Sequence, residues 1–250
     1  RFPPDRIFAA FFGAGDQADQ LVVWSIRLPR ALAAFLVGAA LGMSGAALQG
    51  LLRNPLAEPG VLGVSATASL TATFSLYYGL VSVSAWVLPI AAIAGALIAT
   101  SLLAVAAIQT RSVITLILIG VGLSSFAGAL MSLLMNLAPN PFSLSDMINW
   151  MLGSVANRSF VEIGFALPFL LAGTGILLVT GRGLTALTLG EEAASAVGLN
   201  LVNQRIFTVL GAGLATGASV ALAGAIGFVG IVAPHLVRPL VGHDPARSLT

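Results

Sequence analysis

The sequence predicts an all-α protein that crosses a membrane several times. Of its 250 residues 58% are hydrophobic and only 8% are charged, and mean hydropathy is +1.01, whereas an ordinary soluble domain is about 25% charged. Long stretches between the few charged residues contain no charge. A helix needs about 20 apolar residues to cross the hydrocarbon of a membrane. The charge-free stretches are 31–52, 59–110, 112–145, 163–181 and 206–237.

These stretches predict the spans in chain order. The second stretch is too long for one span, and we divide it where Tyr77, Tyr78, Gly79 and Pro89 provide the aromatic and turn residues of a membrane interface. The expected spans are 31–52, 60–79, 86–108, 113–137, 162–180 and 206–227, with a shorter seventh from 228 to 241. All of them belong to one transmembrane domain, 1–250. The chain starts at Arg1 without a methionine and stops just after a polar turn, so we expect a fragment of a longer protein.

Small residues recur at every fourth position on three predicted spans. Small side chains let helix backbones approach closely in a membrane, so we interpret these faces as ordinary helix-packing surfaces. They are Gly38, Gly42, Ala46 and Gly50 on the first span, Gly120, Ser124, Gly128 and Ser132 on the fourth, and Gly213, Gly217, Ala221 and Ala225 on the sixth.

The sequence also contains an apparent internal repeat. Residues 38–55 resemble residues 217–234 at a constant offset of 179, with a proline closing both stretches. Chance similarity between two stretches rich in glycine and alanine is the alternative. Duplicated halves of opposite orientation are typical of transporters, and we expect repeat units near 31–137 and 206–250, the second incomplete.

Several kinds of chemistry are disfavoured by composition. All eleven basic residues are arginines, so a GxxxxGK[ST] phosphate loop is absent and no tract of bases suits nucleic acid. Cysteine is absent, and the two histidines, His235 and His243, have no partner at ligand spacing. All nine acids lie in predicted loops or at helix ends, away from the membrane interior where coupled carriers place a relay. We therefore expect no enzyme, cofactor or metal site in this chain, and any energy for transport from another subunit.

The arginines do not decide orientation, because the two sides of the membrane differ by one. The N-terminal side holds Arg1, Arg6, Arg27, Arg30 and Arg158, and the opposite side Arg53, Arg111, Arg182 and Arg205. Arg27 and Arg30, in IRLPR, can form a fork for carboxylates of another protein. Interfacial anchoring by snorkelling side chains is the alternative.

Two loops have distinctive sequences. In RNPLAEPGVLGVS, residues 53–65, the prolines break the helix and the glycines permit a tight re-entry, which predicts a structural turn. In LGEEAASAVGLN, residues 189–200, Glu191 and Glu192 suit a helix N-terminus and Gly198 its end. A surface helix between spans requires a partner or a membrane surface, and an idle connector is the alternative.

Together these stretches resemble one family. IRLPRALAAFLVGAALGMSGAALQGLLRNPLAEPGVLGVS, the Glu-Glu-Ala-Ala loop and VALAGAIGFVGIVAPHLVR are similar to permease subunits of binding-protein-dependent ABC importers for iron-siderophores, haem and cobalamin. Glu192, Ala193, Ala194 and Gly198 also resemble the EAA-x-x-x-G loop of ABC importer permeases, without its usual apolar-Pro continuation.

The resemblance implies an inverted-repeat, ten-helix subunit of the bacterial inner membrane, of which this fragment lacks the first helix and the last two or so. It implies a homodimer, two ATPase subunits that bind the ATP, and a periplasmic or lipoprotein binding protein. Arg27 and Arg30 would then dock the binding protein. The loop comprising Gly190, Glu191, Glu192, Ala193, Ala194 and Gly198 would couple to the ATPase.

The same resemblance implies a cytoplasmic gate at the turn from Arg111 to Thr115, formed by Ser112, Val113, Ile114 and Thr115. Small hydroxyl residues are usual there, and the two apolar residues depart from that pattern. The span 113–137 would line the pathway. The expected function is therefore import of an iron-siderophore, haem or corrinoid, and an ion-coupled secondary carrier or a channel is the alternative.

Overall fold

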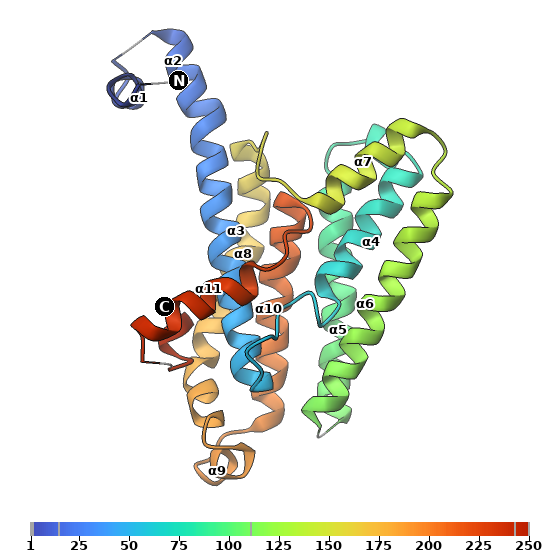
Figure 1. The fold of residues 1–250 in the computed structure, drawn as a ribbon, viewed down its shortest axis with the longest axis vertical. Coiled ribbons are helices and arrows are strands. Elements are labelled where there is room, and N and C mark those ends of the chain that lie inside the picture. The colour runs from blue at the N-terminus through green and yellow to red at the C-terminus, as the bar shows by residue number, and fades with distance from the viewer. Residues whose placement is uncertain (1–2, 15, 111, 243, 250) are drawn as a thin grey trace.

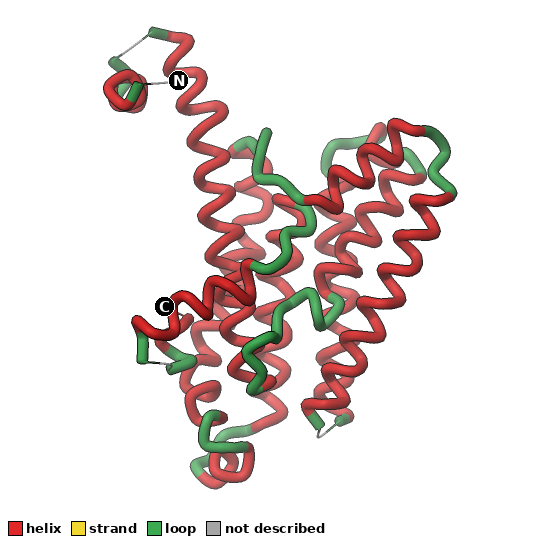
Figure 2. Tube along the Cα trace, viewed as in Figure 1, coloured by secondary structure: helices red, strands yellow, loops and turns green. Residues whose placement is uncertain are grey.

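A computed structural model describes residues 3–14, 16–110, 112–242 and 244–249. Within these ranges the secondary structure is helical and contains no strand (Figure 2). Among the described residues, five helices are long and apolar enough to cross a membrane, which confirms the predicted all-α, polytopic fold. They are Gln17–Leu52, α5 (Val87–Gln109), α6 (Val113–Asn136), α8 (Phe160–Leu187) and α10 (Leu201–Ala223).

The first span is longer than predicted. α2 (Gln17–Leu21), a π-helical segment (Val22–Arg27) and α3 (Leu28–Leu52) form one continuous rod of 36 residues, about 54 Å at 1.5 Å per residue. The predicted span, 31–52, begins directly after Arg30, but a charged residue does not end a helix. α1 (Pro4–Phe11) lies across the upper part of this rod (Figure 1), where Phe11 stacks on Trp24 at 5.3 Å.

The helices form two groups that meet at α10. α3 and α8 pack against one side of α10, and α5 packs against another side together with α4 (Val64–Tyr77) (Figure 1). Close approach is essential at this junction, since a Cβ on Gly217 would lie 2.3 Å from the Cβ of Ala96. α6 is on the outside of its group, with only 17% of its apolar window buried, against 78% for α10.

Two of the predicted spans are half-helices. α4 has 14 residues and α11 (Val229–Val237) has 9, about 21 and 14 Å long, which is too short to cross about 30 Å of hydrocarbon. Both start about halfway along α3 and α10 (Figure 1). The prediction of a full span at 60–79 is therefore wrong, because hydropathy cannot separate an apolar helix from an apolar loop folded into the protein. The segment at 228–241 is short, as predicted, but its helix does not reach across the hydrocarbon.

The two half-helices give the fold an inverted arrangement. α3 and α10 run in opposite directions, and each is followed by a loop and then a half-helix that turns back (Figure 1). The offset of 179 does not relate equivalent positions, however. It pairs Gly45, inside α3, with Gly224, which ends α10, and Pro55, in a loop, with Pro234, inside α11. The repeat boundaries at 31–137 and 206–250 remain a prediction.

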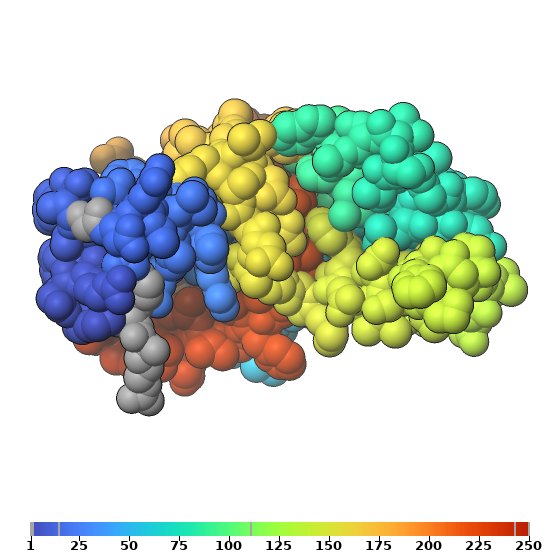
Figure 3. Space-filling view, turned by 90° about the horizontal axis from the view of Figure 1, so that it is seen from above, coloured from blue at the N-terminus to red at the C-terminus, as the bar shows by residue number. Residues whose placement is uncertain are grey.

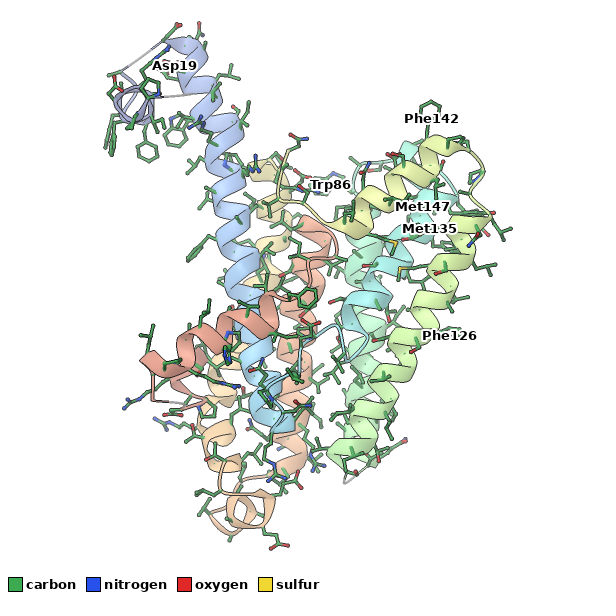
Figure 4. The ribbon with its side chains drawn as sticks, in the orientation of Figure 1. Asp19, Trp86, Phe126, Met135, Phe142 and Met147 are labelled. Carbon is green, nitrogen blue, oxygen red and sulfur yellow. The ribbon has the colours of Figure 1, made fainter. Side chains whose placement is uncertain are left out.

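Two elements of the upper end complete the fold. α7 (Pro141–Leu152) has no counterpart among the predicted elements, although Asn140 caps it and a proline follows at its first turn, a known start signal. It directs the exposed Phe142 away from the molecule and the fully buried Met147 inward (Figure 4). A capping box of Ser159 and Glu162 starts α8. From above, the N-terminal segment and the α4–α6 group lie on opposite sides of the α7–α8 connection (Figure 3).

Candidate coupling site

The predicted coupling loop and the predicted gate lie at the same end of the molecule. α9 (Glu191–Ala196) connects the lower ends of α8 and α10, and the adjoining ends of α5 and α6 lie at about the level of these two helix ends (Figure 1). The sequence resemblance placed both on one side of the membrane. Arg111 of the turn lies outside the described residues, as does His243.

The expected short helix is present between its two glycines. Gly190, with φ +100°, and Gly198, with φ +90°, adopt backbone conformations that L side chains rarely adopt. They turn the chain into and out of α9, and Glu191 and Glu192 occupy its first turn, where carboxylates favour the helix dipole.

α9 is held through a narrow contact and exposes the rest of its surface. Ala194 is completely buried, while Glu192, Ala193 and the flanking Leu189 and Val197 are exposed. The exposed residues are a mixture of apolar and acidic side chains. A helix of this kind presents a surface suitable for a protein partner.

The turn before α6 is held by hydroxyl groups. Ser112 caps α6, its Oγ accepting from the backbone N–H of Thr115 at 3.3 Å, and the Thr110 hydroxyl donates to the Ser112 carbonyl at 3.4 Å. Val113 packs against the core, while Ile114 is exposed. The predicted gate residues therefore comprise two polar and two apolar side chains at the end of a largely uncovered span.

One side chain that sequence analysis did not select joins these two elements. Arg205, in the first turns of α10, is only 4% exposed. Its Nη2 lies 2.8 Å from Glu191 Oε1 of α9, and its Nη1 donates to the Thr110 carbonyl at 3.4 Å. The nearly buried Arg205 guanidinium beside a partly exposed carboxylate marks this residue only in the folded structure. The sequence alone does not indicate the contact, since Thr110 and Arg205 are 95 residues apart.

At the opposite end, Arg27 and Arg30 are both exposed and lie on the upper part of the long first rod (Figure 1). They are three positions apart in the sequence, across the junction of the π-helical segment and α3. Most of the height of the molecule separates them from α9, as the family resemblance implies for residues on opposite sides of the membrane.

The described residues cover only part of the predicted packing faces. On α3, Gly42 faces Ala233, Ala46 is buried and Gly50 faces α8. A Cβ on Gly38 or on Gly128 would meet nothing within 4 Å, so the packing contacts predicted for these two glycines are not made within the described residues. The sixth-span face also ends early, since α10 stops at Ala223 and leaves Ala225 outside it. Periodicity identifies a face but not what covers it.

The small-residue face of α6 is also packed over only part of its length. A Cβ on Gly120 would lie 2.7 Å from the Leu62 Cα, and the Ser124 hydroxyl donates to the Gly60 carbonyl at 2.8 Å. These contacts hold the 53–63 loop, which is built of consecutive turns, against α6. The prediction of a structural turn is confirmed.

Two polar features lie inside the α3–α11 region. The Gln49 amide, 3% exposed, donates to the Gly230 carbonyl at 3.1 Å and accepts from Arg238. A cavity of about 390 Å³ lies beside them. Glu58 is half-buried in the 53–63 loop, part-way along the neighbouring helices (Figure 1). Glu58 is therefore in a loop but not at an end of the bundle, whereas the sequence analysis expected acids in loops to lie away from the membrane interior.

Apolar spans, two half-helices turning back inside the bundle, and an exposed short helix at one end define a membrane transport permease. The chain belongs to the FecCD transport family, whose family model matches residues 1–250.

Individual relatives agree with this assignment. The chain is 40% identical over 249 residues to the ABC transporter permease protein YvrB of Bacillus subtilis (strain 168), covering 97% of this chain and 69% of YvrB. It is 40% identical over 234 residues to the vitamin B12 import system permease protein BtuC of Pectobacterium atrosepticum, covering 94% and 70%. The chain thus spans about two thirds of these relatives.

A solved structure, described as an inward-facing conformation of a metal-chelate type ABC transporter, matches with a TM-score of 0.87 and 33% identity. The match covers 94% of this chain and 74% of that one. The chain is therefore an ABC importer permease of the FecCD/BtuC type, a membrane protein that works with ATPase and substrate-binding partners.

Proposed function

We propose that the protein containing this chain forms the translocation pathway of a bacterial inner-membrane importer for a metal chelate or a corrinoid. ATP is bound and hydrolysed by two separate ATPase subunits, and the ligand is delivered by a periplasmic or lipoprotein binding protein. The relatives support this substrate class, since one is a vitamin B12 permease and another a metal-chelate transporter. An iron-siderophore and haem belong to the same range of large chelates.

A homodimer is the proposed assembly, with α6 as the contact surface. Ile114, Leu118 and Phe126 expose large apolar side chains on this helix (Figure 4 labels Phe126), and Gly128 leaves open space beside them. Lipid can cover such a face, but small residues next to apolar ones also suit a second helix. A pathway between two copies of α6 would run directly past the gate residues at its lower end.

The exposed surface of α9 is the observation that carries the ATPase proposal. This helix packs through the buried Ala194 and exposes most of its surface, and Arg205 links it to the Thr110 carbonyl directly before the predicted gate residues. Of the EAA-type residues, Glu192 and Ala193 belong to this exposed surface, and Ala194 is the buried contact. Seating this helix in a cleft of the ATPase would transmit nucleotide-driven closure to the permease as a rigid-body shift.

A charged substitution on α9 tests this assembly in the full-length parent. Val197→Asp places a carboxylate on the docking surface, and Val83→Asp is the matched control, because the two valines are 74% and 81% exposed at opposite ends. We expect co-purification with the ATPase to fall at least about ten-fold for Val197→Asp, equivalent to about 1.4 kcal/mol, and to persist for the control. Equal retention in both variants would exclude α9 as the docking element.

The driving force and the substrate need a transport assay. The parent, its ATPase and its binding protein are reconstituted in vesicles and supplied with a ferric siderophore, haem or cyanocobalamin. We expect one of them to accumulate only when ATP is present on the ATPase side. Accumulation driven by a proton or sodium gradient without ATP would favour the secondary-carrier alternative.

A further inference from the structure

The contacts of Arg205 connect the two elements that importer function requires to move together. It reaches α9 through Glu191 and the end of α5 through the Thr110 carbonyl, and both bonds come from one guanidinium. The two acceptors sit on elements that touch each other only weakly, since α9 packs mainly on α8 and α10.

The chemistry of the guanidinium suits this double contact. Its nitrogens lie in one rigid plane, so two acceptors bound by different nitrogens are held at a fixed separation. Lysine has a single nitrogen on a flexible stem and cannot impose that separation. Arg205 is also nearly buried, and loss of either acceptor leaves a desolvated donor, which favours movement of both acceptors as a unit.

The acceptor on the gate side lies directly before the gate residues. Thr110 is the first residue after α5, and its hydroxyl donates to Ser112, which caps α6. A displacement of the Thr110 backbone is therefore passed on to the first turn of the pathway helix.

We propose that Arg205 is a positioning residue that couples α9 to the gate, so that a shift of the ATPase-docking helix moves the turn at Ser112–Thr115. This rests on the proposed function, because α9 must be the ATPase-docking helix for its shift to matter. Removing Arg205 uncouples ATP hydrolysis from transport while the ATPase remains bound.

The test uses the reconstituted full-length complex and three substitutions. Arg205→Gln removes the charge and the fork, Arg205→Lys keeps the charge opposite Glu191 but loses the second contact, and Arg182→Gln is the control. Arg182 is an exposed arginine near the same end of α8. ATPase co-purification, ATP hydrolysis and ligand uptake are measured for each variant.

Both Arg205 variants should retain the ATPase and hydrolyse ATP, with ligand imported per ATP reduced roughly 5- to 150-fold, the usual range of coupling between sites. The control should match the parent. Uptake per ATP unchanged in Arg205→Lys would overturn the proposal. Loss of ATPase binding in both Arg205 variants would also overturn it, since Arg205 would then merely support the shape of α9. A parent that retains no ATPase is a separate result, which rejects the proposed function itself.

A distance measurement provides a readout that a purely structural role would not change. These 250 residues contain no cysteine, so spin labels can be attached at Gln109→Cys and Ser195→Cys, exposed positions on α5 and α9. We expect their separation to stay constant between nucleotide-free and ATP-bound states in the parent and to change by several ångströms in Arg205→Lys. A constant separation in both proteins would contradict the coupling role.

Discussion

Replacement of Gly45 by alanine tests how closely the half-helix α11 packs against α3. A Cβ at Gly45 would lie 1.9 Å from the Gly230 carbonyl oxygen and 2.5 Å from its carbonyl carbon and Cα, whereas real Cβ contacts are essentially never below 3.0 Å. Backbone atoms cannot rotate away as a side chain can, so α11 must retreat by about 1 Å in a densely packed interior. The same movement strains the bond from the Gln49 amide to the Gly230 carbonyl.

The size of the effect follows from two opposing terms. Overpacking costs about 1–3 kcal/mol, and the clash with backbone atoms of Gly230 places Gly45→Ala at the upper end. Exchange of glycine for alanine inside a helix recovers about 1 kcal/mol, which leaves a net loss of about 2 kcal/mol. Gly38 lies on the same helix with nothing within 4 Å of its Cβ position, so Gly38→Ala should gain up to about 1 kcal/mol.

The assay is reversible unfolding of the full-length parent and the two variants in mixed micelles, followed by circular dichroism. The expected difference in unfolding free energy between Gly45→Ala and Gly38→Ala is about 3 kcal/mol. Equal stability of the two variants would refute the close approach of α3 and α11, and with it the packing of α11 as a half-helix.

Two further predictions concern the two ends of the molecule. Reversing the exposed charges of Arg27 and Arg30 to glutamate should weaken capture of the binding protein at least about ten-fold and leave ATPase co-purification unchanged; joint loss of both interactions in a pull-down would indicate misfolding instead. At the lower end, a hydrogen bond of 2.7 Å from the Thr185 hydroxyl is the largest cause that lowers the pKa of Asp244 below its ordinary value of 3.8. Because the folded pKa is lowered, the stabilisation is present above the unfolded pKa and disappears as pH falls through the folded one. Thr185→Val should therefore raise the pKa of Asp244 in an NMR titration of labelled aspartate, and an unchanged pKa would contradict the role of this hydroxyl.

Local sequence signals predicted the elements that local interactions determine. The spans expected at 86–108 and 113–137 differ by one residue at each changed boundary from α5 and α6, since Thr110 and Ser112 separate two long apolar runs. α9 was also predicted, because the acidic residues at its start and the glycines on either side are signals within one turn of the helix they define.

The same signals failed where an apolar stretch leaves the helical conformation inside the protein. The loops 53–63 and 224–228 return part-way along the bundle instead of at its surface (Figure 1). Non-helical backbone is tolerated at that depth only when protein covers it, and here the Ser124 hydroxyl and the closely packed Gly120 on α6 provide part of that cover. No hydropathy pattern contains this information, because the covering residues lie about sixty positions away.

The sequence by itself determined that this protein is a helical membrane protein and approximately where its long spans lie, since composition and short-range periodicity control helix formation and insertion in a bilayer; its resemblance to a known family indicated the permease. The tertiary structure alone decided that α4 and α11 are half-helices, that Gly45 faces Gly230, and that Arg205 links Glu191 of α9 to the Thr110 carbonyl. Each of these depends on contacts between residues far apart in the chain, and such contacts exist only after the helices have packed.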